Sequence, residues 1–229
     1  MFNTILSMAS SPAANNSLRI TVAANTTNFV VLAAAQALGF DNELTTDRTI
    51  TVTINAGVEM AGTHGFQTGA LQQNTTLAVI NNGTISAGNG ATGTNGNNGG
   101  AGSTAVFYST VTGGSATHSW INNSVINGGK GGGGSAGQAS TASADGDGSF
   151  TCGNPKRTGT AGALGAFGGT GGTGNYNAST NSTDISECTF SLDVGYTPGT
   201  GGAGGAAIDR QGRTISFTNN GTVNGSIIG

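Results

Sequence analysis

Few side chains in this sequence have the types and spacing that catalysis or metal binding needs. His64 and His118 lie far apart among small polar residues, without an acid and a nucleophile spaced to complete a catalytic group. Each is therefore interpreted as a solvated loop histidine. The stretch Asp145-Gly146-Asp147-Gly148 alternates carboxylates with glycines as calcium loops do, but the bidentate acid of such loops is missing. It is interpreted as a turn, and we predict no bound metal and no cofactor.

The glycines Gly88, Gly90 and Gly93 match the spacing of a dinucleotide-binding loop. That loop must open a helix, and no helix is predicted after Gly93, so the match is interpreted as coincidental. Without any group of residues typical of an active site, we predict that the protein is not an enzyme.

Another set of side chains has the chemistry of binding. Two long interruptions of the glycine-rich sequence, 139–158 and 175–198, carry aromatic residues near Lys, Arg or Asn, which are typical anchors of interfaces when they lie in exposed loops. The predicted receptor-binding residues are Phe150, Lys156, Arg157, Tyr176, Asn177 and Tyr196. The alternative is that these rings fold back over the loops. Phe107, Tyr108 and Trp120 lie in strand-like stretches and are predicted to be core residues.

The cysteines, Cys152 and Cys188, flank the longest glycine run. A disulfide between them would stabilise the fold by about 3–4 kcal/mol through loop entropy. The sequence leaves open whether they are bonded or stay separate thiols, because the distance between their Cα atoms does not follow from it.

Glycine recurs at every third residue in four runs. This period predicts the backbone conformation of the glycine-rich segments that support the loops. A left-handed helix with three residues per turn places each such glycine on one edge, where another backbone approaches closely. Collagen is excluded because the chain has 3 prolines and interrupts each run. The glycines predicted to be structural are Gly90, Gly93, Gly96, Gly99, Gly128, Gly131, Gly134, Gly162, Gly165, Gly168, Gly171, Gly202 and Gly205.

Flexible linkers are the ordinary interpretation of glycine-rich sequence. Ordering a residue costs about 1–2 kcal/mol of backbone entropy, so an isolated run stays disordered. Only a bundle that gains about 1 kcal/mol net per hydrogen bond, together with close contacts, offsets this cost. The shared phase of the runs favours a bundle of polyglycine-II-like helices over linkers.

The residues before the glycine runs show ordinary secondary-structure patterns. Apolar residues alternate with polar ones after Ser17 and again over Thr49–Ile54, which predicts two strands. Between them, a helix is predicted over Phe29–Leu38, with its N-cap supplied by the residues 25–28 and its end at Gly39.

A short internal repeat follows, in which two apolar segments flank an Asn-Asn turn. Its copies are VINNGTIS at 79–86, WINNSVIN at 120–127 and FTNNGTVN at 217–224. Two of these copies lead directly into a glycine run. The repeat therefore predicts a solenoid-like alternation of strand, turn and glycine helix.

The predicted fold is mainly β with polyglycine-II-like helices. It begins with an N-terminal arm, 1–16, and a small strand–helix–strand attachment unit, 17–60. A solenoid-like glycine-rich sandwich, 61–229, follows.

The composition excludes several classes of function. A net charge of −3 with only 7% charged residues gives no basic patch for nucleic acid or for an anionic membrane. No apolar stretch approaches the roughly 18 residues of a transmembrane helix, so membrane insertion is not expected. The N-terminus has no Lys or Arg before Arg19 and is a poor signal peptide. These features fit a protein of the virion, located on the particle surface or the tail. Such a protein would be synthesised in the host cytoplasm and released by cell lysis.

The segments 79–96, 120–134 and 201–223, which join the repeat to glycine triplets, resemble the glycine-rich tail-fibre tip adhesins of T-even-type bacteriophages and related glycine-rich phage virion proteins. The resemblance implies a polyglycine-II sandwich whose loops face the host. This chain lacks the Trp-rich attachment region of the T-even adhesins.

We therefore predict a non-enzymatic virion protein, a receptor-binding adhesin of the tail or tail fibre. Its expected partners are other virion proteins, through residues 1–60, and a host surface glycan or outer-membrane protein. Homo-oligomerisation is left open. One alternative is a structural or capsid decoration protein with no receptor role. Another is a bacterial surface or matrix protein, for which no sorting signal is visible.

Overall fold

The computed structural model describes residues 17–42, 47–94, 97–109, 118–135, 143–145, 158–173, 175–177, 189–191 and 198–229. Within these ranges the chain is mainly β, with one α-helix, as the sequence predicts. No helix among them is long and apolar enough to cross a membrane. The chain divides into two compact units. Unit 1 comprises Met1–Gly88, Ser103–Gly129 and Gly205–Gly229, and unit 2 comprises Asn89–Gly102 and Lys130–Gly204.

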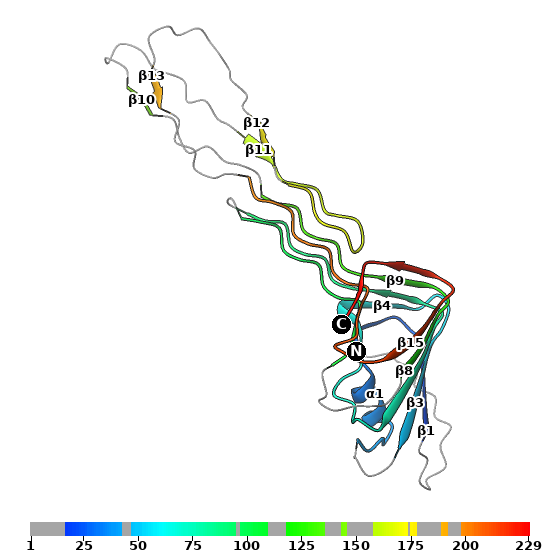
Figure 1. Ribbon diagram of the computed structural model, residues 1–229. Helices are drawn as coiled ribbons and strands as arrows, with labels where there is room; N and C mark the ends of the chain where they lie inside the picture. Colours follow the sequence, from blue (N-terminus) through cyan, green and yellow to red (C-terminus); the bar gives the residue numbers. More distant parts are fainter. Residues whose placement is uncertain are drawn as a thin grey trace. The chain divides into compact units, whose positions relative to one another are not determined.

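The first sheet of unit 1 consists of five parallel strands that lie side by side (Figure 1). In spatial order they are β1 (Ser17–Val22), β3 (Arg48–Ile54), β5 (Thr75–Asn81), β8 (His118–Asn122) and β15 (Ile215–Asn219). Alternate residues face the core: Ile50, Val52 and Ile54 are all fully buried. The predicted strands at Ser17 and over Thr49–Ile54 are thus confirmed.

The second sheet of unit 1 is also parallel and divides at its longest strand. Its strands are β2 (Thr26–Val30), β4 (Glu59–Gln67), β6 (Thr84–Ser86), β7 (Val106–Phe107), β9 (Val125–Asn127), β14 (Ile208–Asp209), β16 (Thr222–Asn224) and β17 (Ile227–Ile228). The start of β4 pairs with β6 and its end pairs with β7. Two columns of strands result, β4-β6-β9-β16 and β4-β7-β14-β17, and β2 pairs along both parts of β4.

The chain therefore runs through unit 1 in repeated passes. Each pass adds one strand to the first sheet and then extends both columns of the second. The passes span residues 17–30, 48–67, 75–107, 118–209 and 215–228. The third and fourth passes contain the segments of unit 2 between their second and third strands.

Aromatic side chains fill the core of unit 1. The ring centroids of Phe66 and Trp120 lie 5.0 Å apart in an edge-to-face arrangement, and Tyr108 lies 6.5 Å from Trp120. Trp120 is fully buried and Tyr108 is 1% exposed. Both residues are thus in the core, as the sequence predicts.

The Asn-Asn repeats stack in register across successive passes. Asn81 donates its side-chain N–H to Oδ1 of Asn122 at 2.8 Å, and Asn122 donates to Oδ1 of Asn219 at 2.8 Å. Asn82, Asn123 and Asn220 form a second ladder with bonds of 2.9 Å. Asn81 and Asn122 are fully buried, so these amides need partners. A slip of one residue would leave buried amides unpaired, and the ladders thereby fix the register.

The turn chemistry predicted for the repeat is also present. In each copy the first asparagine accepts a hydrogen bond from the backbone N–H two residues further on: Gly83 to Asn81, Ser124 to Asn122 and Gly221 to Asn219.

The predicted N-cap of the helix is wrong. α1 spans Val31–Ala37, and its N-cap residue, Val30, makes no side-chain capping bond. The preceding residues form β2 instead, where pairing with β4 and the burial of Phe29 outweigh a cap. Asn25 accepts the backbone N–H of Glu59 at 2.8 Å rather than one from the helix. The end at Gly39 is as predicted, with φ +82° and a bond from its N–H to Gln36.

The structure groups residues 17–60 differently from the predicted attachment unit. β1 and β3 belong to the same sheet as β5, β8 and β15, and β4 begins before residue 60 and ends after it. Parallel pairing between passes, which local sequence patterns do not reveal, joins these residues to the rest of unit 1. Their role in attachment remains a prediction.

Unit 2 is built from glycine-rich runs that lie side by side (Figure 1). The run 130–135, which we call the central run, hydrogen-bonds to the runs 89–94, 97–102, 161–166, 169–173 and 199–204. Bonds to one neighbour recur every third residue: the N–H groups of Gly131 and Gly134 donate to Gly169 and Gly172. The glycine runs therefore pack side by side through backbone hydrogen bonds, as the sequence predicts.

Two of the runs that were predicted to be continuous fold back on themselves. Gly172 donates to Ala163, and Gly168 occupies the turn between them with φ +65°. Gly100 likewise donates to Ala91. Folding back lets both arms of each hairpin reach the central run. Of the predicted structural glycines, Gly96 lies outside the described residues.

In unit 2, glycine occupies the inward positions, and the residues with larger side chains lie at the exposed positions. The central run is buried from Gly131 to Ser135, whereas every other non-glycine residue of the described runs except Lys130 is exposed. A Cβ at Gly132 would collide with the backbone of Ala91 and lie 2.8 Å from the carbonyl oxygen of Gly90. Glycine at these inward positions is thus a steric requirement.

We predict that Gly132→Ala lowers the unfolding free energy by about 3 kcal/mol, because the methyl group must push neighbouring backbones apart. Urea unfolding followed by circular dichroism measures this. Gly169→Ala is the matched control, since its Cβ would lie 3.3 Å from the nearest atom, the carbonyl oxygen of Ala166. The control should stay within about 1 kcal/mol of wild type, and equal effects of the two substitutions would contradict the steric requirement.

Candidate functional site

The predicted receptor-binding residues belong to the two long insertions of unit 2. Tyr176 and Asn177 lie in β12 (Asn175–Asn177), of which the backbone is described. Phe150, Lys156, Arg157 and Tyr196 lie outside the described residues, as do Cys152 and Cys188. Their roles therefore remain predictions, and so does the disulfide.

Backbone pairing brings the two insertions together. β10 (Ser143–Asp145) of the first pairs antiparallel with β13 (Thr189–Ser191) of the second, so that Ala144 is opposite Phe190. β11 (Thr158–Thr160) pairs antiparallel with β12, and Gly159 is opposite Tyr176. The sequence predicts the two insertions as exposed loops but not their pairing, because pairing between such short strands leaves no periodic signal.

Both insertions start and end at the same end of the bundle of runs. The first leaves after Ser135, whose N–H donates to Asn97 and whose carbonyl accepts from Gly199, where the chain returns from the second insertion. Gly134 in turn donates to Gly172 and accepts from Gly162, which border the other ends of the two insertions. These described residues form one rim, which holds all four attachment points by backbone hydrogen bonds.

The rim also carries exposed polar side chains that sequence reasoning missed. Thr94, Asn97, Asn98 and Thr200 are all exposed, and Oδ1 of Asn98 accepts the backbone N–H of Thr200 at 2.9 Å. Their position next to breaks in the glycine phase is the signal that could have identified them.

The two histidines are not solvated loop residues, contrary to the sequence prediction. His118 is an inward-facing residue of β8, is 2% exposed, and accepts the backbone N–H of Leu77 at Nδ1 over 3.2 Å. His64 is half-buried, with Nδ1 2.7 Å from the carbonyl oxygen of Thr104 and its ring stacked on Phe107. Parallel pairing places both histidines in unit 1 rather than in exposed loops.

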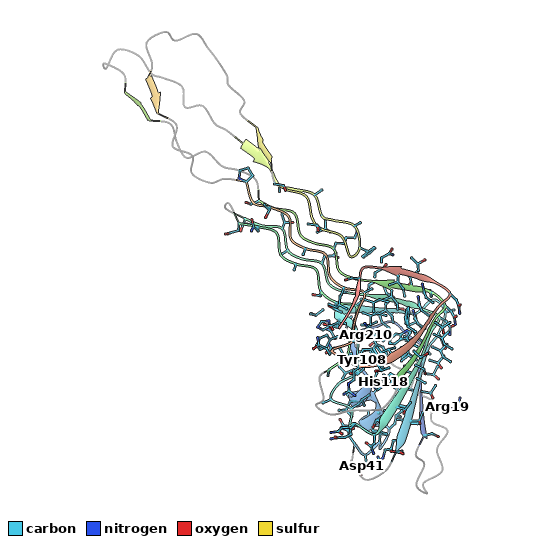
Figure 2. All side chains as sticks on the ribbon, in the orientation of Figure 1. Arg19, Asp41, Tyr108, His118 and Arg210 are labelled. Atoms are coloured by element: carbon cyan, nitrogen blue, oxygen red, sulfur yellow. The ribbon has the colours of Figure 1, made fainter. Side chains whose placement is uncertain are left out.

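Burial dominates the electrostatics around His118. Figure 2 shows Tyr108, His118 and Arg210 in the same part of unit 1. Burial, followed by the nearby charge of Arg213, lowers the pKa of His118 to about 4. Burial also raises the pKa of Tyr108, while Arg213 lowers it to a smaller extent. Both groups are therefore neutral at physiological pH.

The described residues contain no cluster of three or more His, Cys, Asp or Glu that could hold a metal. Asp145 lies in β10, and the remainder of the proposed turn 145–148 is outside the described residues.

Comparison with known proteins identifies the class to which this architecture belongs. Residues 17–228 match the sequence model of a family described as phage tail fibre adhesin Gp38. The match spans both units, and the chain therefore belongs to this family of adhesins of the virion tail.

A solved structure to which this chain is similar is the crystal structure of the gp37-gp38 adhesin tip complex of the bacteriophage S16 long tail fiber. The TM-score is 0.42 at 14% sequence identity, over 91% of this chain and 81% of that chain. No curated protein matches the sequence significantly.

The buried His118 predicts a loss of stability in acid. The folded state has a pKa near 4 and the unfolded state one near 6.5, so the unfolded chain binds the extra proton first. The free energy of unfolding should fall by up to roughly 1.4 kcal/mol per pH unit between about pH 6.5 and 4.

Urea unfolding across this pH range measures the slope. His118→Asn keeps an acceptor near the N–H of Leu77 but does not titrate, so the difference between the variant and wild type isolates His118 from the carboxylates. Parallel pH profiles of the two proteins would contradict the prediction.

Proposed function

We propose that this protein is a receptor-binding adhesin of the phage tail fibre, which presents the insertions 139–158 and 175–198 to the host surface. The observation that carries the proposal is the shared rim: the residues that border both insertions are bonded to one another at one end of unit 2. Family membership supplies the class of activity.

We infer that the runs of unit 2 are polyglycine-II helices and that unit 1 is a solenoid of the repeated passes. The three-residue period of the hydrogen bonds supports the first inference, because a threefold helix turns successive residues toward different neighbours. The in-register parallel strands of successive passes support the second. Such a scaffold holds the insertions without a large apolar core.

The chemistry of the insertions favours recognition by hydrogen bonds and aromatic contacts. With only 7% charged residues and a net charge of −3, the chain has little means of electrostatic capture. Tyr176, Asn177 and the polar rim instead suit a surface glycan or the polar loops of an outer-membrane protein. Binding of this kind requires no enzymatic step.

The protein is expected to be held by another protein of the tail fibre. In the S16 structure the tip is a complex of gp37 with gp38, and by analogy we propose a fibre subunit as the partner here. The sequence prediction assigns this contact to residues 1–60, which belong to unit 1 in the structure.

A structural or decoration protein is the alternative function. The number of copies per purified particle distinguishes the two, since a fibre tip is present in few copies and a decoration protein in tens to hundreds.

We predict that the double variants Tyr176→Ala/Asn177→Ala and Lys156→Ala/Arg157→Ala weaken adsorption of particles to host cells at least tenfold. The melting temperature should not change, because these residues lie beyond the glycine runs that stabilise unit 2. Adsorption-rate measurements with purified particles test this.

Phe167→Ala is the control for this experiment. Phe167 is 41% exposed in unit 2, in the turn where the two arms 161–166 and 169–173 meet, away from the rim. Its loss should leave adsorption unchanged. Normal adsorption by both double variants would favour the decoration protein.

A further inference from the structure

Two asparagines of unit 2 bind the backbone of a neighbouring run through their side chains. Oδ1 of Asn89 accepts the backbone N–H of Lys130 at 3.1 Å, and Oδ1 of Asn98 accepts the backbone N–H of Thr200 at 2.9 Å. Both asparagines are exposed. The runs are otherwise joined mainly by bonds between backbone groups, so these two contacts differ in kind from their neighbours.

Each asparagine is followed by a glycine that completes the same arrangement. The N–H of Gly90 donates to the carbonyl of Lys130 at 2.8 Å, and the N–H of Gly99 donates to the carbonyl of Thr200 at 2.8 Å. An Asn-Gly pair therefore holds both backbone groups of one residue in the neighbouring run. We call this arrangement an Asn-Gly clamp.

The chemistry of the clamp explains why these two residue types occur together. A Cβ at Gly99 would collide with the carbonyl group of Gly132 in the central run, so only glycine fits at this inward position. Asn98 is exposed, and its side-chain oxygen is an acceptor of the same kind as a backbone carbonyl. Among the described residues, this oxygen is the acceptor to which the N–H of Thr200 is bonded.

The two clamps lie at opposite ends of the central run. Asn89 binds its first residue, whereas Asn98 lies at the rim, where Ser135 ends the run. Thr200 directly follows Gly199, at which the chain returns from the second insertion and whose N–H donates to Ser135. The Asn98 clamp thus acts on the border of an insertion, and the Asn89 clamp does not.

Without the Asn98 side chain, the border of the second insertion would be held less firmly. The peptide group that joins Gly199 to Thr200 would lose the bond of its N–H. Because a peptide group is planar, its orientation sets the direction in which the preceding chain leaves the rim. A binding surface that is held in its bound arrangement loses less entropy on association, and its affinity is higher for that reason.

We propose that Asn98 is a positioning residue for receptor binding, whose side-chain oxygen holds the second insertion in the orientation that the receptor recognises. Asn98 acts through Thr200 and does not itself touch the receptor. This inference rests on the proposed function, which places recognition in the two insertions. It assigns a determinant of affinity to a residue outside both of them.

The test compares Asn98→Ala with Asn89→Ala in otherwise wild-type phage. The two substitutions remove bonds of the same kind, so the melting temperatures of the purified proteins should be alike. The rate of adsorption to host cells should fall about three- to tenfold with Asn98→Ala and stay unchanged with Asn89→Ala. Hydrogen exchange at the amide of Thr200 should become about tenfold faster in Asn98→Ala and stay at the wild-type rate in Asn89→Ala.

Two further substitutions separate positioning from direct contact with the receptor. Asn98→Asp keeps an acceptor for the N–H of Thr200 but loses the amide N–H groups, so adsorption should stay near the wild-type rate. Asn97→Asp places the same charge on the neighbouring exposed residue and controls for the effect of charge on the receptor. If both Asp variants adsorb poorly, the negative charge is the cause, and the two Ala variants decide.

Normal adsorption by Asn98→Ala, or an equal loss with Asn89→Ala, would overturn the inference. So would a melting temperature that Asn98→Ala lowers more than Asn89→Ala does, because the residue would then be structural. Poor adsorption by Asn98→Asp beside normal adsorption by Asn97→Asp would show that the amide contacts the receptor directly, which also contradicts the proposal. Normal adsorption by the double variants at 156–157 and 176–177 would instead refute the proposed function.

Discussion

The structure depends on satisfying backbone N–H and C=O groups where few side chains are available to cover them. In unit 2 this is achieved by bringing backbones so close that they bond directly, and only glycine permits that approach. The central run 130–135 is the clearest case, since it is bonded to five neighbouring runs. The position of every loop border follows from this network, because each border residue is also a hydrogen-bonding partner of another run.

Unit 1 meets the same requirement with side chains. Its parallel strands satisfy one another's backbone, and the buried amides of Asn81 and Asn122 are satisfied along the stack. Each amide is both donor and acceptor, so a ladder extends without limit but always ends with one unpaired group. Regular stacking thus specifies the register strongly but does not by itself end the stack.

The sequence predicts those features that have a local period. Alternation revealed β1 and β3, the triplet phase revealed the runs of unit 2, and the Asn-Asn repeat revealed the turns by which the chain passes from the first sheet to the second. Features that depend on contacts between distant segments escaped it. The residues 25–28 have good capping chemistry, yet pairing with β4 makes residues 26–28 part of β2. His118 looks like a loop residue among small polar neighbours, and only the register with Leu77 places it in the core.

In the candidate site, too, the sequence predicts the local features but not those that depend on contacts between distant segments. Composition located the two insertions, since they interrupt a regular phase, but nothing in the sequence indicates that β10 pairs with β13 or that the four insertion borders share one rim. Those relations arise from the packing of the runs into one bundle, which depends on hydrogen bonds between segments far apart in the sequence, such as that between Asn98 and Thr200.

The three-residue hydrogen-bonding period of the central run limits how the runs can change in length during evolution. An insertion of one or two residues in any run would rotate all following donors away from their acceptors, whereas three residues restore the direction of every bond. A neighbouring run must then lengthen by the same amount, or the added residues would have no partners. Related proteins should therefore differ in this unit by coordinated multiples of three, while their loops change length freely.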